Sequence, residues 1–134
     1  MNPNRDYGIA LLRIMLGGLM LFHGLVKIFV FTPAGTVGFF ASLGLPASLA
    51  YLTILIEAGG GLALILGLFT RYNALLQAAV LVGTIVTVHG ANGFGFSVKG
   101  GGWEYPAMWA ITLVALSLIG NGAFALTIGS KKAA

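Results

Sequence analysis

Apolar residues dominate four long stretches of the chain, and short polar or glycine-rich segments separate these stretches. They cover residues 8–31, 47–68, 71–90 and 103–126. A helix of about 20 predominantly apolar residues is long enough to cross the hydrocarbon core of a bilayer. The pattern therefore predicts an all-α protein, an integral membrane four-helix bundle, built as a single membrane domain over residues 1–134.

A shorter apolar segment, residues 34–44, lies between the first and second stretches. It is too short to cross a membrane and too apolar for an ordinary loop. Thr32 and Pro33 end the first stretch, and Pro46 opens the second. We expect a short interfacial or re-entrant helix between these prolines.

Composition narrows the class of protein. The 134 residues are 58% hydrophobic and only 7% charged, whereas a soluble domain is typically about 25% charged. Too little polar surface is available to cover a water-exposed globule. The chain has no cysteine, which excludes disulfides and thiolate chemistry within it. The net charge of +4 comes from few groups, so it indicates membrane topology and not nucleic-acid binding.

Positive charges outside the four stretches favour one side of the membrane. With four crossings, Arg5, Arg71, Lys131 and Lys132 lie on the side of both termini, and Lys99 lies opposite. Because basic residues prefer the cytoplasmic side, we predict that both termini are cytoplasmic.

Small residues recur every four positions on one face of the second stretch and of the third. They are Gly59, Ala63 and Gly67 in the second, and Ala79, Gly83 and Thr87 in the third. Helices in lipid associate by close packing at small residues. We therefore expect these two faces to pack together across the short turn at Arg71.

Glu57 is the most informative residue of the sequence, because it lies at the middle of the second stretch. A carboxylate at the bilayer centre costs roughly 2.5–3.5 kcal/mol, so it needs a partner or a function. The first stretch carries Arg13, His23 and Lys27 on one side. His23 and Glu57 have similar depths, about 12 and 15 Å below the outer surface. We expect them to hydrogen-bond, directly or through one water, with Lys27 also within reach.

Two more ionisable residues, His89 and Glu104, fall near the same outer ends of their stretches. Simpler interpretations exist for each of these residues. In one alternative, Arg13 and Lys27 snorkel, which means that their long side chains reach the membrane surface. In another, His89 and Glu104 are ordinary interfacial residues. A His23–Glu57 hydrogen bond is structural in a third. We predict no metal site, because no pair has the spacing of metal ligands.

Three glycines directly follow Glu57. At Gly60 they leave room for a flat ligand, or they allow a neighbouring backbone to approach closely. Packing alone is the simpler explanation of the two.

The chain resembles the DoxX family of small four-span membrane proteins. The matching segments are Leu12-Arg13-Ile14, Phe22-His23-Gly24, Lys27-Ile28-Phe29, Gly44-Leu45-Pro46, Glu57-Ala58-Gly59-Gly60-Gly61, Gly67-Leu68-Phe69-Thr70-Arg71, His89 and Glu104-Tyr105-Pro106. The resemblance implies a multi-pass protein of a bacterial inner membrane, associated with redox metabolism. Its members include a quinone-linked oxidoreductase subunit, partners in quinone or catechol detoxification, and an anchor for oxidative-stress enzymes.

The first functional hypothesis is a redox-linked subunit that binds a quinone or similar ring within the bundle. His23 and Glu57 would be catalytic, and a supporting or ligand-binding role would fall to Arg13, Lys27, Gly60, His89 and Glu104. We expect no covalent cofactor, and no complete active site is evident in this chain. A protein partner would have to bring the redox cofactor, such as flavin, iron–sulfur or haem.

The second hypothesis is a non-enzymatic membrane anchor or assembly subunit for a partner complex. The polar cluster would then be internal to the bundle, and the apolar outer face would carry the function. A transporter ranks last, because the sequence shows no pair of broken helices. The sequence leaves a homo-oligomer open.

Overall fold

A computed structural model of the protein describes residues 2–126, and every regular element within that range is helical. Lys131 and Lys132, which enter the topology prediction, lie outside the described residues. The elements are α1 (Pro3–Phe29), α2 (Thr32–Ser42), α3 (Ala47–Ile54), η1 (Leu55–Gly59), α4 (Gly60–Leu66), α5 (Thr70–Thr84), η2 (Ile85–His89), η3 (Gly90–Asn92) and α6 (Glu104–Ile119).

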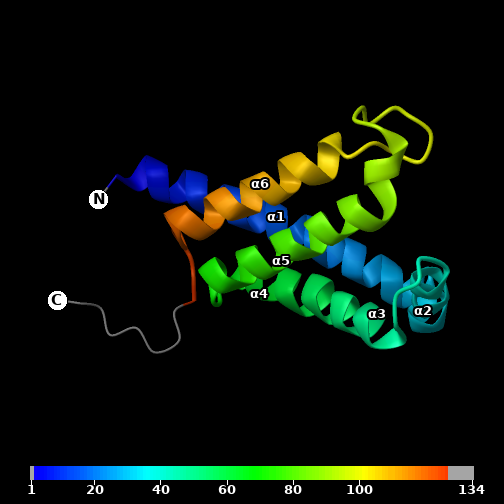
Figure 1. Ribbon diagram of the computed structural model, residues 1–134. Coiled ribbons are helices and arrows are strands. Elements are labelled where there is room, and N and C mark those ends of the chain that lie inside the picture. Colours follow the sequence, from blue (N-terminus) through cyan, green and yellow to red (C-terminus); the bar gives the residue numbers. More distant parts are fainter. Residues whose placement is uncertain (1, 127–134) are drawn as a thin grey trace.

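These elements form four helical rods that run in alternating directions (Figure 1). The first is α1, and the second joins α3, η1 and α4. The third joins α5, η2 and η3, and the fourth is α6. Within the described residues, Pro3–Phe29, Ala47–Leu66 and Thr70–Asn92 are long and apolar enough to cross a membrane, and α6 is a shorter apolar helix of 16 residues. The all-α class is confirmed, and the fourth crossing stays a prediction.

The first rod begins earlier than the hydrophobic pattern indicates, at Pro3. The Asn2 side chain accepts a hydrogen bond of 3.1 Å from the Asn4 backbone N–H, and Pro3 occupies the first turn. Asparagine before a helix and proline at its start are both favourable, because they suit the N–H groups that lack partners there. Local capping thus extends the helix beyond the apolar stretch.

The short helix expected between the first two rods is present as α2. Its Thr36 hydroxyl is 3.2 Å from the Lys27 carbonyl and 2.9 Å from the Thr32 carbonyl. The first of these contacts ties α2 to the end of α1. The second stays within the first turn of α2.

The predicted end of the fourth stretch at residue 126 is wrong. The helix stops at Ile119, because Gly120 (φ 93°) and Gly122 (φ 68°) adopt left-handed conformations. Residues 120–126 then fold back over the ends of α1 and α4. The Ala123 N–H donates to the Asp6 carbonyl at 3.0 Å, and the Leu126 N–H donates to the Leu66 carbonyl at 2.9 Å.

The predicted packing of the second rod on the third through small residues is also wrong. Gly59 and Gly83 are exposed, and a Cβ at Gly83 would have nothing within 4 Å. The close approach is made between α1 and the second rod instead. A Cβ on Gly24 would overlap the Ala58 backbone, and one on Gly17 would lie 2.8 Å from the Gly61 carbonyl oxygen.

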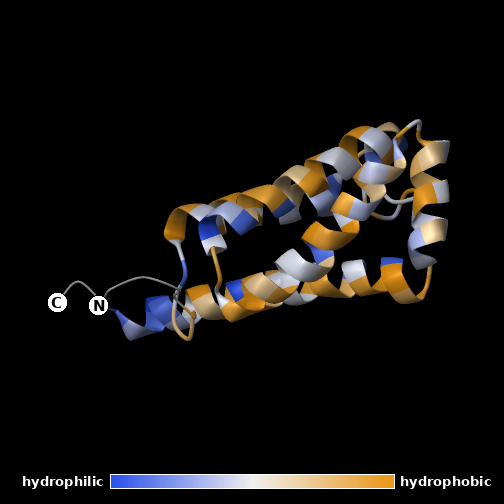
Figure 2. Cartoon of the chain, turned by 90° about the horizontal axis from the view of Figure 1, so that it is seen from below, coloured by the Kyte–Doolittle hydropathy of each residue, from blue (hydrophilic) through white to orange (hydrophobic). Residues whose placement is uncertain are grey.

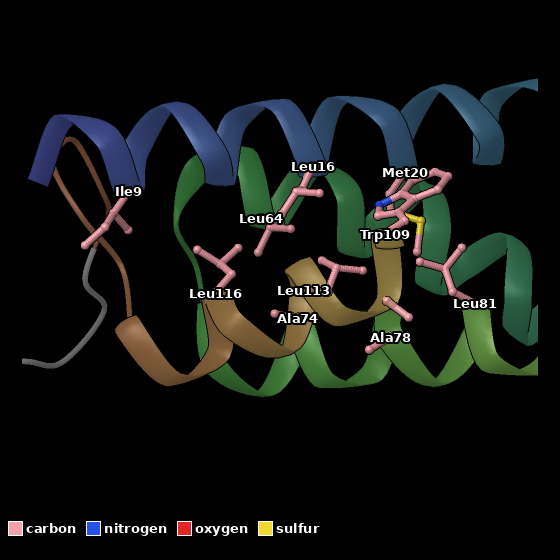
Figure 3. Packing of buried hydrophobic residues seen from close by; sticks show 11 residues of the cluster. Ile9, Leu16, Met20, Leu64, Ala74, Ala78, Leu81, Trp109, Leu113 and Leu116 are labelled. Carbon is pink, nitrogen blue, oxygen red and sulfur yellow. The ribbon is translucent and has the colours of Figure 1, made fainter. Parts of the chain in front are cut away.

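Buried apolar side chains from α1, α4, α5 and α6 interdigitate along the axis of the molecule (Figure 3). Leu16, Leu64, Leu113 and Leu116 are almost fully buried there. The outside of the rods is apolar as well, with polar residues at scattered positions and at the start of α1 (Figure 2). An apolar surface on every rod is typical of helices that face lipid.

Candidate functional site

Two of the ionisable residues lie on the two π-helical segments of the described chain. Glu57 is on η1 and His89 is on η2. A π turn contains one more residue than an α turn, so it widens the helix and redirects side chains, and such turns are frequent at functional sites. Both rods are therefore irregular at the level where their ionisable groups lie. The sequence offers only the nearby glycines, Gly59 and Gly90, as a signal for this irregularity.

Glu57 has the partner that its depth requires, and this partner is Lys27. The Lys27 Nζ and Glu57 Oε2 atoms lie 2.7 Å apart, with side-chain exposures of 20% and 6%. The geometry is that of an ion pair rather than a well-aligned hydrogen bond. An opposite charge compensates a buried carboxylate better than a neutral imidazole does, and the long lysine stem can reach it.

His23 therefore does not make the expected direct hydrogen bond to Glu57 in the described structure. Its Nδ1 atom lies 2.8 Å from the carbonyl oxygen of Leu19, one turn earlier on α1. Because a carbonyl only accepts, this bond assigns a proton to Nδ1. Nε2 has no hydrogen-bond partner within residues 2–126. The imidazole ring also packs edge-on against Trp109, with ring centroids 5.1 Å apart.

These groups line a cavity of about 540 Å³, to which all four rods and α2 contribute. Its ionisable lining residues are His23, Lys27, Glu57 and His89. The rest of its wall is mainly aliphatic and aromatic, and includes Met20, Phe40, Leu52, Leu76, Leu81 and Trp109. The volume falls within the range of sites for small organic ligands, which typically combine apolar walls with a few convergent polar groups.

His89 and Glu104 form hydrogen bonds to the loop between the third and fourth rods. The His89 Nδ1 atom is 2.9 Å from the Gly101 carbonyl, and His89 also lines the cavity. The Glu104 carboxylate accepts a hydrogen bond of 3.1 Å from the Phe96 N–H, but Glu104 is exposed and outside the cavity wall. Its contribution is to hold the loop segment that places Phe96 at the cavity.

Arg13 is fully buried, at 0% exposure, and it is distant from the cavity wall. The snorkelling alternative is therefore wrong for this residue. Its guanidinium donates to the carbonyls of Leu64, Ile65, Asn121 and Ala123. These bonds fasten the segment 120–126 to the ends of α1 and α4. Five fixed N–H donors suit a cluster of converging carbonyls better than an ammonium would.

Gly60 does not leave room for a ligand. Its carbonyl accepts a hydrogen bond of 2.7 Å from Asn73 Nδ2, and a Cβ at Gly60 would lie 2.8 Å from Asn73 Oδ1. Asn73 also accepts from Gln77, which is fully buried. Neither amide is among the residues expected from the sequence, although their spacing of four residues on one helix is a recognisable signal.

Trp109 is a third residue that is absent from the sites expected from the sequence. It is 6% exposed and lines the cavity beside His23. Its indole N–H has no hydrogen-bond partner within the described chain. Tyr105 precedes it by one turn and packs against it with ring centroids 5.7 Å apart. An aromatic pair at this spacing predicts a shared helix face, but not which cavity that face meets.

Comparison with known proteins identifies relatives. The DoxX family profile matches residues 8–90. CatD of Bacillus subtilis, named as a candidate oxidoreductase, is 36% identical over 126 residues, which cover 94% of this chain and 89% of CatD. The inner membrane protein YqjF of Escherichia coli is 35% identical over 89 residues, covering 66% and 67% of the two chains. An uncharacterized protein of Haemophilus influenzae is 31% identical over 124 residues, covering 91% and 90%. No solved structure matches this chain.

Proposed function

Because this chain belongs to the DoxX family of membrane proteins, we propose that it is a membrane subunit of a redox-linked system that binds a quinone or a similar flat ring. One observation carries the proposal. His23, Lys27, Glu57 and His89 converge on an apolar cavity of about 540 Å³. The name of CatD supports the redox association, and the name of YqjF supports an inner-membrane location.

The polar groups of the cavity suit the carbonyl oxygens of such a ring. The Lys27 ammonium is a donor, and His23 Nε2 donates when the imidazole is protonated. Neutral His23 carries its proton on Nδ1, where the Leu19 carbonyl holds it. This hydrogen bond from Nδ1 to the Leu19 carbonyl also fixes the orientation of the imidazole ring. In the proposal, Nε2 is therefore the atom that exchanges a proton with a ligand.

Reduction of a quinone to a quinol consumes two electrons and two protons. In this proposal the electrons come from a protein partner that carries a flavin, an iron–sulfur cluster or a haem. This chain binds and orients the ring, excludes water from it and exchanges protons through His23 and Glu57. Glu57 lies 2.7 Å from Lys27, so the two side chains form one polar group in the cavity wall.

The test uses Trp109 as a reporter of the cavity. The chain has two tryptophans, and Trp103 does not line the cavity, so a Trp103→Phe background leaves Trp109 as the only indole. We expect saturable quenching of its fluorescence when a benzoquinone is titrated into the protein in bilayer vesicles. Glu57→Gln and His23→Ala should weaken binding about tenfold or more, whereas Lys99→Gln, on the exposed loop, should leave it unchanged.

Two outcomes count against the proposal. Quenching that rises linearly with quinone concentration, without saturation, would exclude a bound ring. Full quinone-linked turnover of an assembled complex that contains Glu57→Gln would exclude a proton-handling role for this carboxylate, because an amide cannot titrate. Either result would favour the alternative of a non-enzymatic anchor for a partner complex.

A further inference from the structure

We propose that the cavity opens sideways into the lipid between α3 and α5, and that its ligand is a polar ring carrying a long hydrocarbon chain. This inference rests on the proposed function, since it concerns the ligand of the same cavity. The ring would lie against Lys27 and Glu57, and the chain would leave through the opening and stay in the bilayer.

The opening is defined by residues that line the cavity and are also exposed. On α3 these are Leu49 and Leu52, and Leu52 is 49% exposed. On α5 they are Leu76, at 50% exposure, with Ala79 and Gly83. A side chain that contacts both an internal cavity and the outside of the protein borders the mouth of that cavity. The exposed positions face each other from two neighbouring rods.

The chemistry of this mouth identifies the class of molecule that passes it. All five bordering residues are aliphatic or glycine, and they lie on rods that are long and apolar enough to cross a membrane. Water gains nothing by entering such a mouth, but a hydrocarbon chain fits it. The ion pair, on α1 and η1, belongs to the same cavity wall. The cavity therefore combines charged groups with an aliphatic border, which matches an amphiphile.

The outer end of the cavity has a different character. Its exposed lining residues are aromatic, and they are Phe39, Phe96 and Tyr105. Aromatic rings with this exposure are typical of the membrane–water interface. A water-borne ring without a chain would have to enter there. The two ends thus separate two sources of ligand, the lipid phase and the aqueous phase.

Gly83 offers a way to close the lateral mouth alone. It borders the mouth, and a Cβ at this position would have nothing within 4 Å. The Cβ of a substituted side chain therefore meets no neighbour at this position. Gly18 on α1 is a matched control, because its Cβ would also have nothing within 4 Å and it does not line the cavity.

The experiment measures Trp109 quenching in vesicles of the Trp103→Phe protein with two probes. One is a benzoquinone with a polyisoprenoid chain, and the other is the same ring without the chain. We expect Gly83→Phe to weaken binding of the long-chain probe about tenfold or more, while the short probe keeps its affinity. Gly18→Phe should change neither. Leu52→Phe serves as a second variant on the opposite border of the mouth, because phenylalanine adds no second indole to the fluorescence signal.

The outcomes separate this inference from the proposed function. Unchanged long-chain binding in both Gly83→Phe and Leu52→Phe would overturn the lateral mouth. An equal loss for both probes would also overturn it, because the effect would not depend on the chain. Either result leaves the proposed function standing. If neither probe quenches Trp109 in the Trp103→Phe protein without a further substitution, the proposed function itself fails.

Discussion

At the scale of single residues, the cavity depends on a charge pair in a mostly apolar environment. Lys27 and Glu57 neutralise each other at 2.7 Å, and both line the cavity. Replacing a buried ion pair by apolar groups is often neutral for stability, whereas removing one partner leaves an uncompensated charge. In the proposed function, the role of the pair is therefore to bind a ligand and not to stabilise the fold.

We predict that Lys27→Met and Glu57→Gln each lower the free energy of unfolding by about 3 kcal/mol, because each leaves one polar partner behind. The double variant should recover most of this loss, since no unpaired charge remains. Ring binding should not recover in the double variant. Unfolding by dodecyl sulfate in mild detergent, followed by circular dichroism, measures the stabilities. Additive losses in the double variant would show that the pair contributes no coupling.

Arg13 shows a different use of a buried cation. It has no carboxylate partner among the described residues, and its hydrogen bonds go to backbone carbonyls on two segments. Carbonyls near a helix end lack partners within their own helix. Leu64 and Ile65 are in the last turn of α4. The Leu64 carbonyl also accepts from the Gly67 N–H at 3.0 Å, so Arg13 gives it a second donor and supplies a donor to the Ile65 carbonyl.

At the scale of elements, the π segments and the glycine contacts work together. α1 lies close against η1 because Gly24 has no side chain to hold it away from Ala58. This close approach brings Lys27, one turn further along α1, to the level of Glu57 on η1. The ion pair thus depends on a backbone contact between two elements.

We predict that Gly24→Ala destabilises the protein by about 3 kcal/mol or more, because its Cβ would overlap backbone atoms of Ala58 that have no room to move. Gly18→Ala makes the same change where nothing lies within 4 Å. It should be neutral or stabilising by up to about 1 kcal/mol. Unfolding midpoints of the two variants in the same detergent check this difference. Equal midpoints would contradict the close packing of α1 on η1.

At the scale of the whole molecule, the alternating rods return the chain to its starting side. The segment after α6 contacts the beginning of α1, through the Ala123 N–H and the Asp6 carbonyl (Figure 1). At 16 residues α6 is about 24 Å long, somewhat less than the hydrocarbon core of about 30 Å. A shorter helix is accommodated by local thinning or by its flanking residues.

We predict that the N-terminal end of the molecule faces the cytoplasm and the loop that carries Lys99 faces outward. Because the chain has no cysteine, single cysteines at the exposed positions Asn4 and Lys99 report sidedness directly. A membrane-impermeant maleimide should label Lys99→Cys in intact spheroplasts, and Asn4→Cys only after permeabilisation. The reverse labelling pattern would show that the topology is inverted. Labelling of both cysteines in intact spheroplasts would contradict the prediction that the two positions lie on opposite sides of the membrane.

The sequence by itself determined the class of protein and the approximate position of its rods. Apolar stretches of this length have few folded alternatives in lipid, because the backbone must satisfy its hydrogen bonds within each helix. The sequence also predicted that Glu57 needs a partner, because a lone carboxylate at this depth is costly. The short helix α2 followed from an apolar segment bounded by prolines.

Only the tertiary structure decided which partner Glu57 takes, where α6 ends and which glycines pack. Depth along a helix gave His23 and Lys27 as candidates, but the choice depends on the rotation of α1 against η1 and on how far each side chain reaches. Glycines end α6, but glycines also lie inside other helices, and the path of residues 120–126 depends on carbonyls that Arg13 holds from a distant part of the chain. Part of the cavity wall lies on two π turns, and such turns leave no periodic pattern in the sequence.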